Sequence, residues 1–428
     1  MRREGKTPCR LRRLSPSKGE KKPCLGSVYS PFEGEPPKAA GGQNGETMQL
    51  RRKALTLLVV LLAATLSAPA VQMDRLRAHV TWLADPAREG RRAGQPGAVE
   101  AAQYISAEFF QLGFDVQMQD FGFGRRNVVA RHGDAEKYIV VGAHYDGQGK
   151  GMPSASDNAA GVAVLLDLAR DLKGARLPAS LVMIAFDDEE QGLVGSRHYV
   201  DNSPWPLENA LAVIIFDTMG RSFLDLQSAT LFVLGTEYSD ELSTVVAKRS
   251  RQDMLVAGTD LVGPRSDFAP FALKRIPYLF FTHATHQDYH GPGDTADKIN
   301  YRRLTQDAAL IGEIIRDIAR LKSKPVYRAE PLYPSSEVDT ILRLFQSVKS
   351  EKKDLPPAYQ LIFEDMAKKL RAEKSRPTMQ LAAASLLALA TPRLSPFMLD
   401  FMLAPYYQSQ NRTDVVAAIK EESARWDK

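Results

Sequence analysis

One stretch, residues 180–193, constrains the fold of this chain more than any other. Its first seven residues, Ser180 to Phe186, form an apolar run with the length and composition of a buried β-strand. Four carboxylates follow directly, at positions 187–190, and Gly192 comes soon after them. Adjacent carboxylates repel one another, and a nearby cation would offset that repulsion. We therefore expect a strand that ends either at a solvated acidic turn or at a metal site.

The length and composition are those of a globular protein with one large domain and an accessory region. The chain has 428 residues and a net charge of +5, but residues 1–53 alone hold 13 Lys/Arg against 5 Asp/Glu. From Val71 onward there are 43 basic and 46 acidic residues, so the basic character gives no support for nucleic-acid binding. Both cysteines, Cys9 and Cys24, also precede Val71. Any metal in the body must therefore be held by His, Asp and Glu.

The first 70 residues predict a leader. Residues 1–47 are rich in Lys, Arg, Pro and Gly, and we interpret them as a disordered or mis-assigned extension, with Met48 as the true start. Residues 48–70 contain a basic start, a 13-residue apolar run and an A-x-A cleavage site, which are the three parts of a signal peptide. We expect cleavage after Ala70 and a periplasmic or secreted protein without a stable membrane anchor. The alternative is a membrane anchor formed by an uncleaved 54–70 segment.

The body alternates strands and helices between residues 71 and 323. This pattern predicts a three-layer αβα sandwich with a mostly parallel central sheet. The expected strands are 114–119, 127–131, 137–142, 180–186, 210–216, 231–234 and 276–281. The expected helices are 73–84, 96–112, 162–172, 193–200, 237–251 and 301–321. Residues 324–428 show no buried-strand pattern, so we expect an α-helical C-terminal region of three or four helices.

Polar residues recur where the apolar strands end. They are His144, Asp146, Glu189, Glu190, Asp217 and His290, while Asp157 lies at the start of a helix. Ligands of parallel α/β sheets collect outside the carboxyl ends of the strands, so we expect these side chains to converge. Two histidines and several carboxylates without cysteine suit one or two zinc ions with open positions. Taken singly, each residue has a structural explanation, such as an N-cap for Asp157.

Five motifs in this order resemble the co-catalytic zinc aminopeptidases of the bacterial leucyl aminopeptidase type. That family is related to glutamate carboxypeptidase and glutaminyl cyclase, and the resemblance covers roughly residues 74–322. The motifs are Gly142-Ala-His-Tyr-Asp146, Ser156-Asp-Asn-Ala-Ala-Gly161, Glu189-Glu-Gln-Gly-Leu-Val-Gly-Ser196, Phe216-Asp217 and Asp288-Tyr-His-Gly-Pro-Gly-Asp-Thr295. The resemblance implies a di-zinc metallopeptidase that removes N-terminal residues from peptides with a free N-terminus.

The same resemblance implies a set of metal ligands for two Zn²⁺ ions. His144 and Asp217 resemble the ligands of one zinc. Glu190 and His290 resemble those of the other, and Asp157 resembles the carboxylate that bridges both. The expected nucleophile is a water that bridges the two metals.

The resemblance also implies roles for residues that do not bind metal. Glu189 resembles the general base that takes a proton from the water and delivers it to the leaving amine. Asp146 resembles the carboxylate that orients the imidazole of His144, and Asp294 is a weaker candidate for the same role at His290. Tyr289 or another tyrosine is a candidate for stabilising the oxyanion.

Some histidines and acids near these motifs have simpler interpretations. Family members often carry His after a downstream Ser-Asp, whereas Phe268 stands at that position here, which affects only expectations about the substrate pocket. His283 and His286 form an H-x-x-H pattern, a spacing compatible with metal binding, but we interpret both as structural. Asp187 and Asp188 more plausibly end the strand than bind metal.

Three other functions compete with the aminopeptidase interpretation. A two-zinc carboxypeptidase or deacylase presents the same ligand order, but such enzymes usually insert a dimerisation domain of about a hundred residues before the last histidine. Only 73 positions separate Asp217 from His290 here. A glutaminyl cyclase-like transferase is a second alternative. A non-catalytic interaction protein that binds a partner through its helical tail is the third, although all six ligand and base positions are filled.

Overall fold

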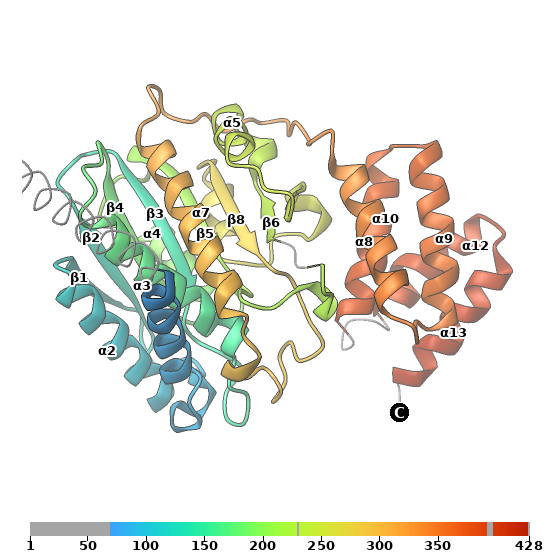
Figure 1. The fold of residues 1–428 in the computed structure, drawn as a ribbon, viewed down its shortest axis with the longest axis horizontal. Helices are drawn as coiled ribbons and strands as arrows, with labels where there is room; N and C mark the ends of the chain where they lie inside the picture. Colours follow the sequence, from blue (N-terminus) through green and yellow to red (C-terminus); the bar gives the residue numbers. More distant parts are fainter. Residues whose placement is uncertain (1–68, 229–230, 392–396, 427–428) are drawn as a thin grey trace, which may run out of the picture. The chain divides into compact units, whose positions relative to one another are not determined.

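The computed structural model describes residues 69–228, 231–391 and 397–426 (Figure 1). The predicted extension over 1–47 and the predicted signal peptide over 48–70 lie outside the described residues, except for positions 69 and 70. Among the described residues, no helix has the length and apolar character needed to cross a membrane.

An eight-stranded sheet forms the centre of the α/β part, with the strand order β1-β2-β4-β3-β5-β8-β6-β7. The strands are β1 (Asp115–Asp120), β2 (Arg126–His132), β3 (Tyr138–His144), β4 (Ser180–Phe186), β5 (Ala210–Phe216), β6 (Leu231–Leu234), β7 (Met254–Val256) and β8 (Tyr278–Thr282). The four central strands β4, β3, β5 and β8 are parallel to one another. β2 joins β4 and β6 joins β8 in antiparallel fashion, as does β1 with β2. The prediction of a mostly parallel central sheet is confirmed.

Helices cover both faces of the sheet, as predicted. Because side chains alternate along a strand, Ile139 and Val141 of β3 enter one core whereas Val140 enters the other. The first core packs under a helix over 69–83 and under α2 (Pro96–Gln111), α3 (Ala160–Leu172), α5 (Asp240–Lys248) and α7 (Tyr301–Ala319). The second packs under α4 (Val194–Asp201) and α6 (Phe268–Leu273). Figure 1 shows α2, α3 and α7 together on one side of the sheet.

Two short elements differ from the prediction. Strand β7 follows α5 where we expected only a loop, and α6 precedes β8. Both are too short to show a clear period: β7 has three residues and α6 has six. β7 pairs with β6, and α6 packs on β5 and β8, so tertiary contacts define both elements.

The only regular elements described in the C-terminal region are helices, as predicted, but there are more of them than the three or four expected. They are α8 (Glu337–Glu351), α9 (Pro357–Ala372), α10 (Arg376–Ala390), α12 (Ala404–Ser409) and α13 (Thr413–Trp426), with a short π-type turn η8 (Met398–Leu403) before α12. Their hydrophobic cluster also includes Phe223, Leu255 and Leu261 of the α/β part. The helical region therefore shares a hydrophobic core with β7 and with the loops that carry Phe223 and Leu261.

Candidate active site

The site is built at the carboxyl edge of the parallel strands. His144 is the last residue of β3, and Asp217 directly follows β5. Glu189 and Glu190 come three and four positions after β4, and His290 lies in the loop after β8. Because these four strands are parallel and adjacent, their ends meet at one edge of the sheet.

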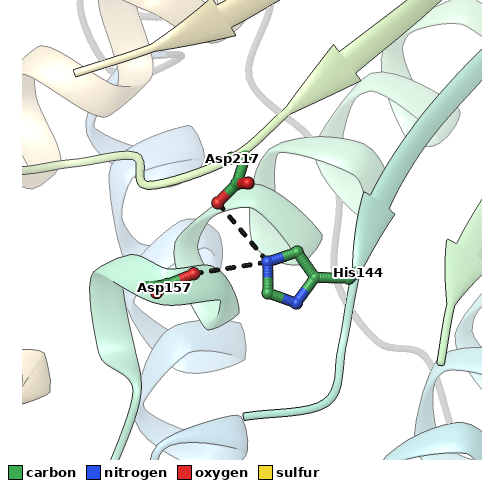
Figure 2. A group of neighbouring side chains, drawn as sticks. All are labelled: His144, Asp157 and Asp217. Carbon is green, nitrogen blue, oxygen red and sulfur yellow. Dashed lines mark hydrogen bonds and ion pairs between the residues drawn. The ribbon is translucent and has the colours of Figure 1, made fainter. Parts of the chain in front are cut away.

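Asp157 stands between two clusters of possible metal ligands. It lies in the short turn η2 (Ala155–Ala159) before α3. Its Oδ1 is 3.3 Å from His144 Nε2, which is 3.4 Å from Asp217 Oδ1 (Figure 2). Its Oδ2 is 2.9 Å from His290 Nε2, which is 3.3 Å from Glu190 Oε2. The two triads, each with donor atoms close enough for one ion, thus share a carboxylate.

The carboxylates of the two clusters are buried, unlike most acidic side chains. The side chains of Asp157 and Glu190 are each only 5% exposed, and Glu190 Oε1 has no hydrogen-bond donor among the described residues. Burial, together with the neighbouring charge of Asp157, raises the pKa of Glu190 to about 8. Burial also opposes ionisation of Asp157, but contacts with His144 and His290 lower the pKa of Asp157 below its usual range. A buried carboxylate oxygen without a partner is costly, and a bound cation would remove that cost.

Asp146 connects the histidine of one cluster to the backbone of both glutamates. Its Oδ1 lies 3.4 Å from His144 Nδ1. Its two carboxylate oxygens also accept hydrogen bonds from the backbone N–H groups of Glu189, at 3.1 Å, and Glu190, at 3.2 Å. One buried carboxylate thereby fixes the direction in which the two glutamate side chains leave the chain.

Glu189 belongs to neither cluster but lines the same pocket as their acids. Its side chain is buried, and this burial raises the pKa of Glu189 well above its usual range, with Asp217 and Asp267 adding to the effect and His144 opposing it. A buried carboxyl with a raised pKa beside a metal-type site has the properties of a group that exchanges protons.

A pocket of about 520 Å³ opens over this edge of the sheet. The residues that line it come from several loops and from the C-terminal region. They are Asp157, Glu189, Glu190, Gly192, Leu193, Arg197, Asp217, Pro264, Arg265, Tyr289, His290, Ala390 and Thr391. The pocket is large enough for a short peptide, and the end of α10 forms part of its wall.

Comparison with known proteins agrees with this geometry. Residues 127–315 match the model described as Peptidase family M28, and this range contains both clusters and Glu189. The similarity of this range to a peptidase family and the two buried clusters together support a metallopeptidase.

Curated relatives are similar to part of this chain. "Aminopeptidase YwaD" of Bacillus subtilis is 31% identical over 198 residues, which are 44% of this chain and 42% of the relative. "Uncharacterized protein YfbL" of Escherichia coli is 29% identical over 245 residues, which are 48% of this chain and 76% of the relative. The chain thus spans less than half of the Bacillus relative.

Solved structures share the fold. Legionella pneumophila LapA aminopeptidase superposes with a TM-score of 0.52 and 22% identity, over 59% of this chain and 72% of LapA. The zinc aminopeptidase BSAP of Bacillus subtilis gives a TM-score of 0.51 and 17% identity, over 60% of this chain and 98% of BSAP. At these identities the likeness concerns the fold alone.

One expectation about the site differs from the structure. Asp294 does not contact His290; its carboxylate instead accepts hydrogen bonds from the backbone N–H groups of Ser156, at 3.0 Å, and Asp157, at 3.2 Å. Asp294 therefore fixes the turn that carries Asp157. The sequence suggested only the role at His290, because Asp294 is near His290 in sequence but not near Asp157.

The neighbouring acids and histidines make structural contacts. Asp187 accepts a hydrogen bond from Arg126 N, and Asp188 pairs with Arg125 at 2.6 Å. His283 accepts from Gly220 N at 2.7 Å and lies 3.0 Å from Asp307. His286 lies 2.6 Å from the hydroxyl of Ser156. Among the described residues, none of these acids or histidines belongs to the two ligand clusters.

Arg91 supports the site and was not identified from the sequence. It is fully buried, and its guanidinium donates to four backbone carbonyls, those of Leu83, Tyr145, Pro153 and Ser154. Burial lowers the pKa of Arg91 to about 10, while the acids of the site oppose that shift. The guanidinium thus ties the loop after His144 to the loop before Asp157. No local pattern marks such a residue, because its four acceptors come from three separate segments.

Gln148 is a second residue that the sequence did not reveal. Its side-chain amide donates to Glu190 Oε2 and lies 3.2 Å from His290 Nε2. It comes from the loop after β3, whereas Glu190 follows β4 and His290 follows β8. A glutamine in a Gly/Ser/Pro-rich loop carries no signal of such a position.

Proposed function

We propose that this protein is a zinc-dependent aminopeptidase that hydrolyses N-terminal residues from peptides. The observation that carries the proposal is Asp157, a buried carboxylate that faces a histidine of each cluster, with Glu189 outside both clusters in the same pocket. The names of the relatives support it, since they include aminopeptidases and a "Probable zinc metalloprotease" of Pyrenophora teres.

The residues fit two zinc ions. His144, Asp157 and Asp217 would hold one ion, and Asp157, Glu190 and His290 the other. Imidazole and carboxylate are suitable zinc ligands, and the partnerless Glu190 Oε1 is free to bind a cation. When bound, zinc lowers the pKa of a water ligand and polarises a carbonyl group.

A side chain of the protein, rather than the metal, would transfer the proton from the water to the leaving amine. In this proposal Glu189 accepts a proton from the attacking water and donates it to the leaving amine. Asp146 keeps Glu189 aimed at the pocket through its backbone hydrogen bond. The pocket acids also pair with the free α-ammonium of the peptide, which would restrict cleavage to the first residue. Tyr289, stacked on His290 with ring centroids 3.9 Å apart, is the candidate hydrogen-bond donor to the oxyanion.

A panel of aminoacyl-nitroanilides and dipeptides tests the proposal. We expect release of free amino acids that stops on chelation and returns with added zinc, at a stoichiometry near two ions per chain. The products also separate the alternatives, because a glutaminyl cyclase would release pyroglutamyl peptides and a carboxypeptidase would require a free C-terminus. Absence of hydrolysis in a zinc-loaded protein would contradict the proposal.

We also propose that residues 48–70 direct export and are removed. The apolar run and the A-x-A site within this range support the proposal. N-terminal sequencing of the protein recovered from the periplasm or medium should begin at Val71. Recovery of the uncleaved chain in the membrane fraction would favour the anchored alternative.

A further inference from the structure

Two arginines line the same pocket as the candidate metal ligands. Arg197 projects from α4, and Arg265 lies in the loop before α6. Both side chains are exposed, and neither guanidinium makes a hydrogen bond or ion pair with another described residue. The other charged groups of the pocket are the four acids and His290, all of which belong to the proposed catalytic machinery.

The nearby acids are already paired with other groups. Asp260 lines a second cavity of about 400 Å³ that also includes Arg197 and Pro264, so the two cavities adjoin. Asp260 is held by Arg376, whose Nε lies 2.7 Å from Asp260 Oδ2. Asp188, which follows the same strand as Glu189, pairs with Arg125. Neither pocket arginine is therefore paired with a carboxylate among the described residues.

The loop that carries Arg265 is held in place by the C-terminal region. Glu337 of α8 accepts a hydrogen bond from Gly258 N and pairs with Arg376 of α10. Glu237 accepts a hydrogen bond from Thr259 N at 2.7 Å in the same loop. Buried and half-buried charges thus fix the segment that leads to Pro264 and Arg265, so this part of the pocket wall has a defined position.

We propose that Arg197 and Arg265 bind a carboxylate of the substrate on the leaving side of the scissile bond. This inference rests on the proposed aminopeptidase function and gives it a substrate class. In a short peptide the α-ammonium lies near the pocket acids, and the carboxylate lies a few bonds beyond the scissile carbonyl. Guanidinium groups match carboxylates in geometry and charge. The carboxylate is either the C-terminus of a di- or tripeptide or an acidic side chain.

Matched peptide pairs test the inference. The first residue is the one released fastest from the nitroanilide panel, written here as Xaa. Xaa-Gly is compared with Xaa-Gly-amide to test the C-terminal carboxylate, and Xaa-Glu-amide with Xaa-Gln-amide to test an acidic side chain. The variants are Arg197→Gln, Arg265→Gln and the double variant, with Arg302→Gln, exposed on α7, as the control.

We expect the wild type and the control to prefer the carboxylate member of at least one pair. The preference, measured as the ratio of kcat/KM values, should fall about fivefold in each arginine variant, mainly through KM, because exposed ion pairs contribute up to about this factor. The peptide pair whose kcat/KM ratio falls in the arginine variants identifies the source of the carboxylate. Hydrolysis with equal ratios in the wild type and all variants would overturn the inference while leaving the aminopeptidase proposal intact.

Binding provides a readout independent of turnover. Calorimetric titration of Glu189→Gln protein with the same peptides should give tighter binding of the carboxylate members, and adding Arg197→Gln and Arg265→Gln should abolish that difference. If no peptide is hydrolysed by the wild type, this titration still decides the question. Equal affinity for acid and amide would then contradict the role of the arginines.

Discussion

Among the individual residues, Asp157 faces both candidate clusters, whereas each of the other four ligands belongs to only one. The strand-end positions of His144 and Asp217 allowed these residues to be predicted from the sequence, because parallel strands bring their carboxyl ends together. The sharing of Asp157 was implied only by the family resemblance. Arg91 could not be predicted, since its four acceptors are brought together only by the fold.

Loss of the shared carboxylate should remove more metal than loss of an outer one. We expect Asp157→Asn to abolish binding of both zinc ions, because an amide is a weaker ligand and both clusters lose a charge. Asp217→Asn should retain part of the metal, since the cluster of Glu190 and His290 remains complete. Mass spectrometry of the purified proteins gives the metal content of both variants. Equal losses in the two variants would show that Asp157 is not shared.

At the scale of elements, the long strands and helices were predictable because their hydrophobic periods are clear. Strand β7 and helix α6 were not, because each is defined by distant partners: β7 pairs with β6, and α6 packs on β5 and β8. The contribution of α10 to the pocket wall was equally hidden, since no local feature of Ala390 or Thr391 points to the site. The loop near residue 260 connects this helical region to the pocket.

Arg376 holds the loop near residue 260 in position. It pairs with Asp260 and Glu337 and lies over the ring of Tyr333 at 3.5 Å. We expect Arg376→Gln to lower the free energy of unfolding by about 1.5–3 kcal/mol, the range for hydrogen bonds to charged groups. It should also raise KM, because Arg265 loses its fixed position.

The matched control for this change is Arg343→Gln. Arg343 is exposed on α8 and makes no hydrogen bond or ion pair with another described residue. Urea denaturation and steady-state kinetics on both variants give the comparison. An unchanged KM in Arg376→Gln, together with normal stability, would show that the loop does not depend on this contact.

For the whole molecule, buried histidine limits stability in acid. His79 is 8% exposed and lies 2.6 Å from the Tyr104 hydroxyl. Burial lowers the pKa of His79 from its ordinary value of 6.5 to about 4, with Arg170 and Arg75 adding to the effect. Between these two values the unfolded chain binds more protons than the folded chain, so the free energy of unfolding falls as the pH falls from 6.5 to 4.

Replacing His79 should weaken this pH dependence. We expect the stability of His79→Gln relative to the wild type to be about 2 kcal/mol more favourable at pH 5 than at pH 7.5. Urea denaturation at the two pH values measures this difference, and His198→Gln on α4 serves as the control. An identical difference between variant and wild type at both pH values would show that His79 does not carry this proton linkage.

The central claim is that Glu189 transfers the proton without holding the metal, although it is adjacent to a proposed ligand. The most direct measurement is hydrolysis and zinc content of Glu189→Gln, determined on the same preparation. We predict full zinc content and a loss of kcat of about 10²–10⁴-fold, the contribution typical of a general base. Unchanged hydrolysis at full zinc content would contradict the account, and so would a loss of activity explained entirely by a loss of zinc.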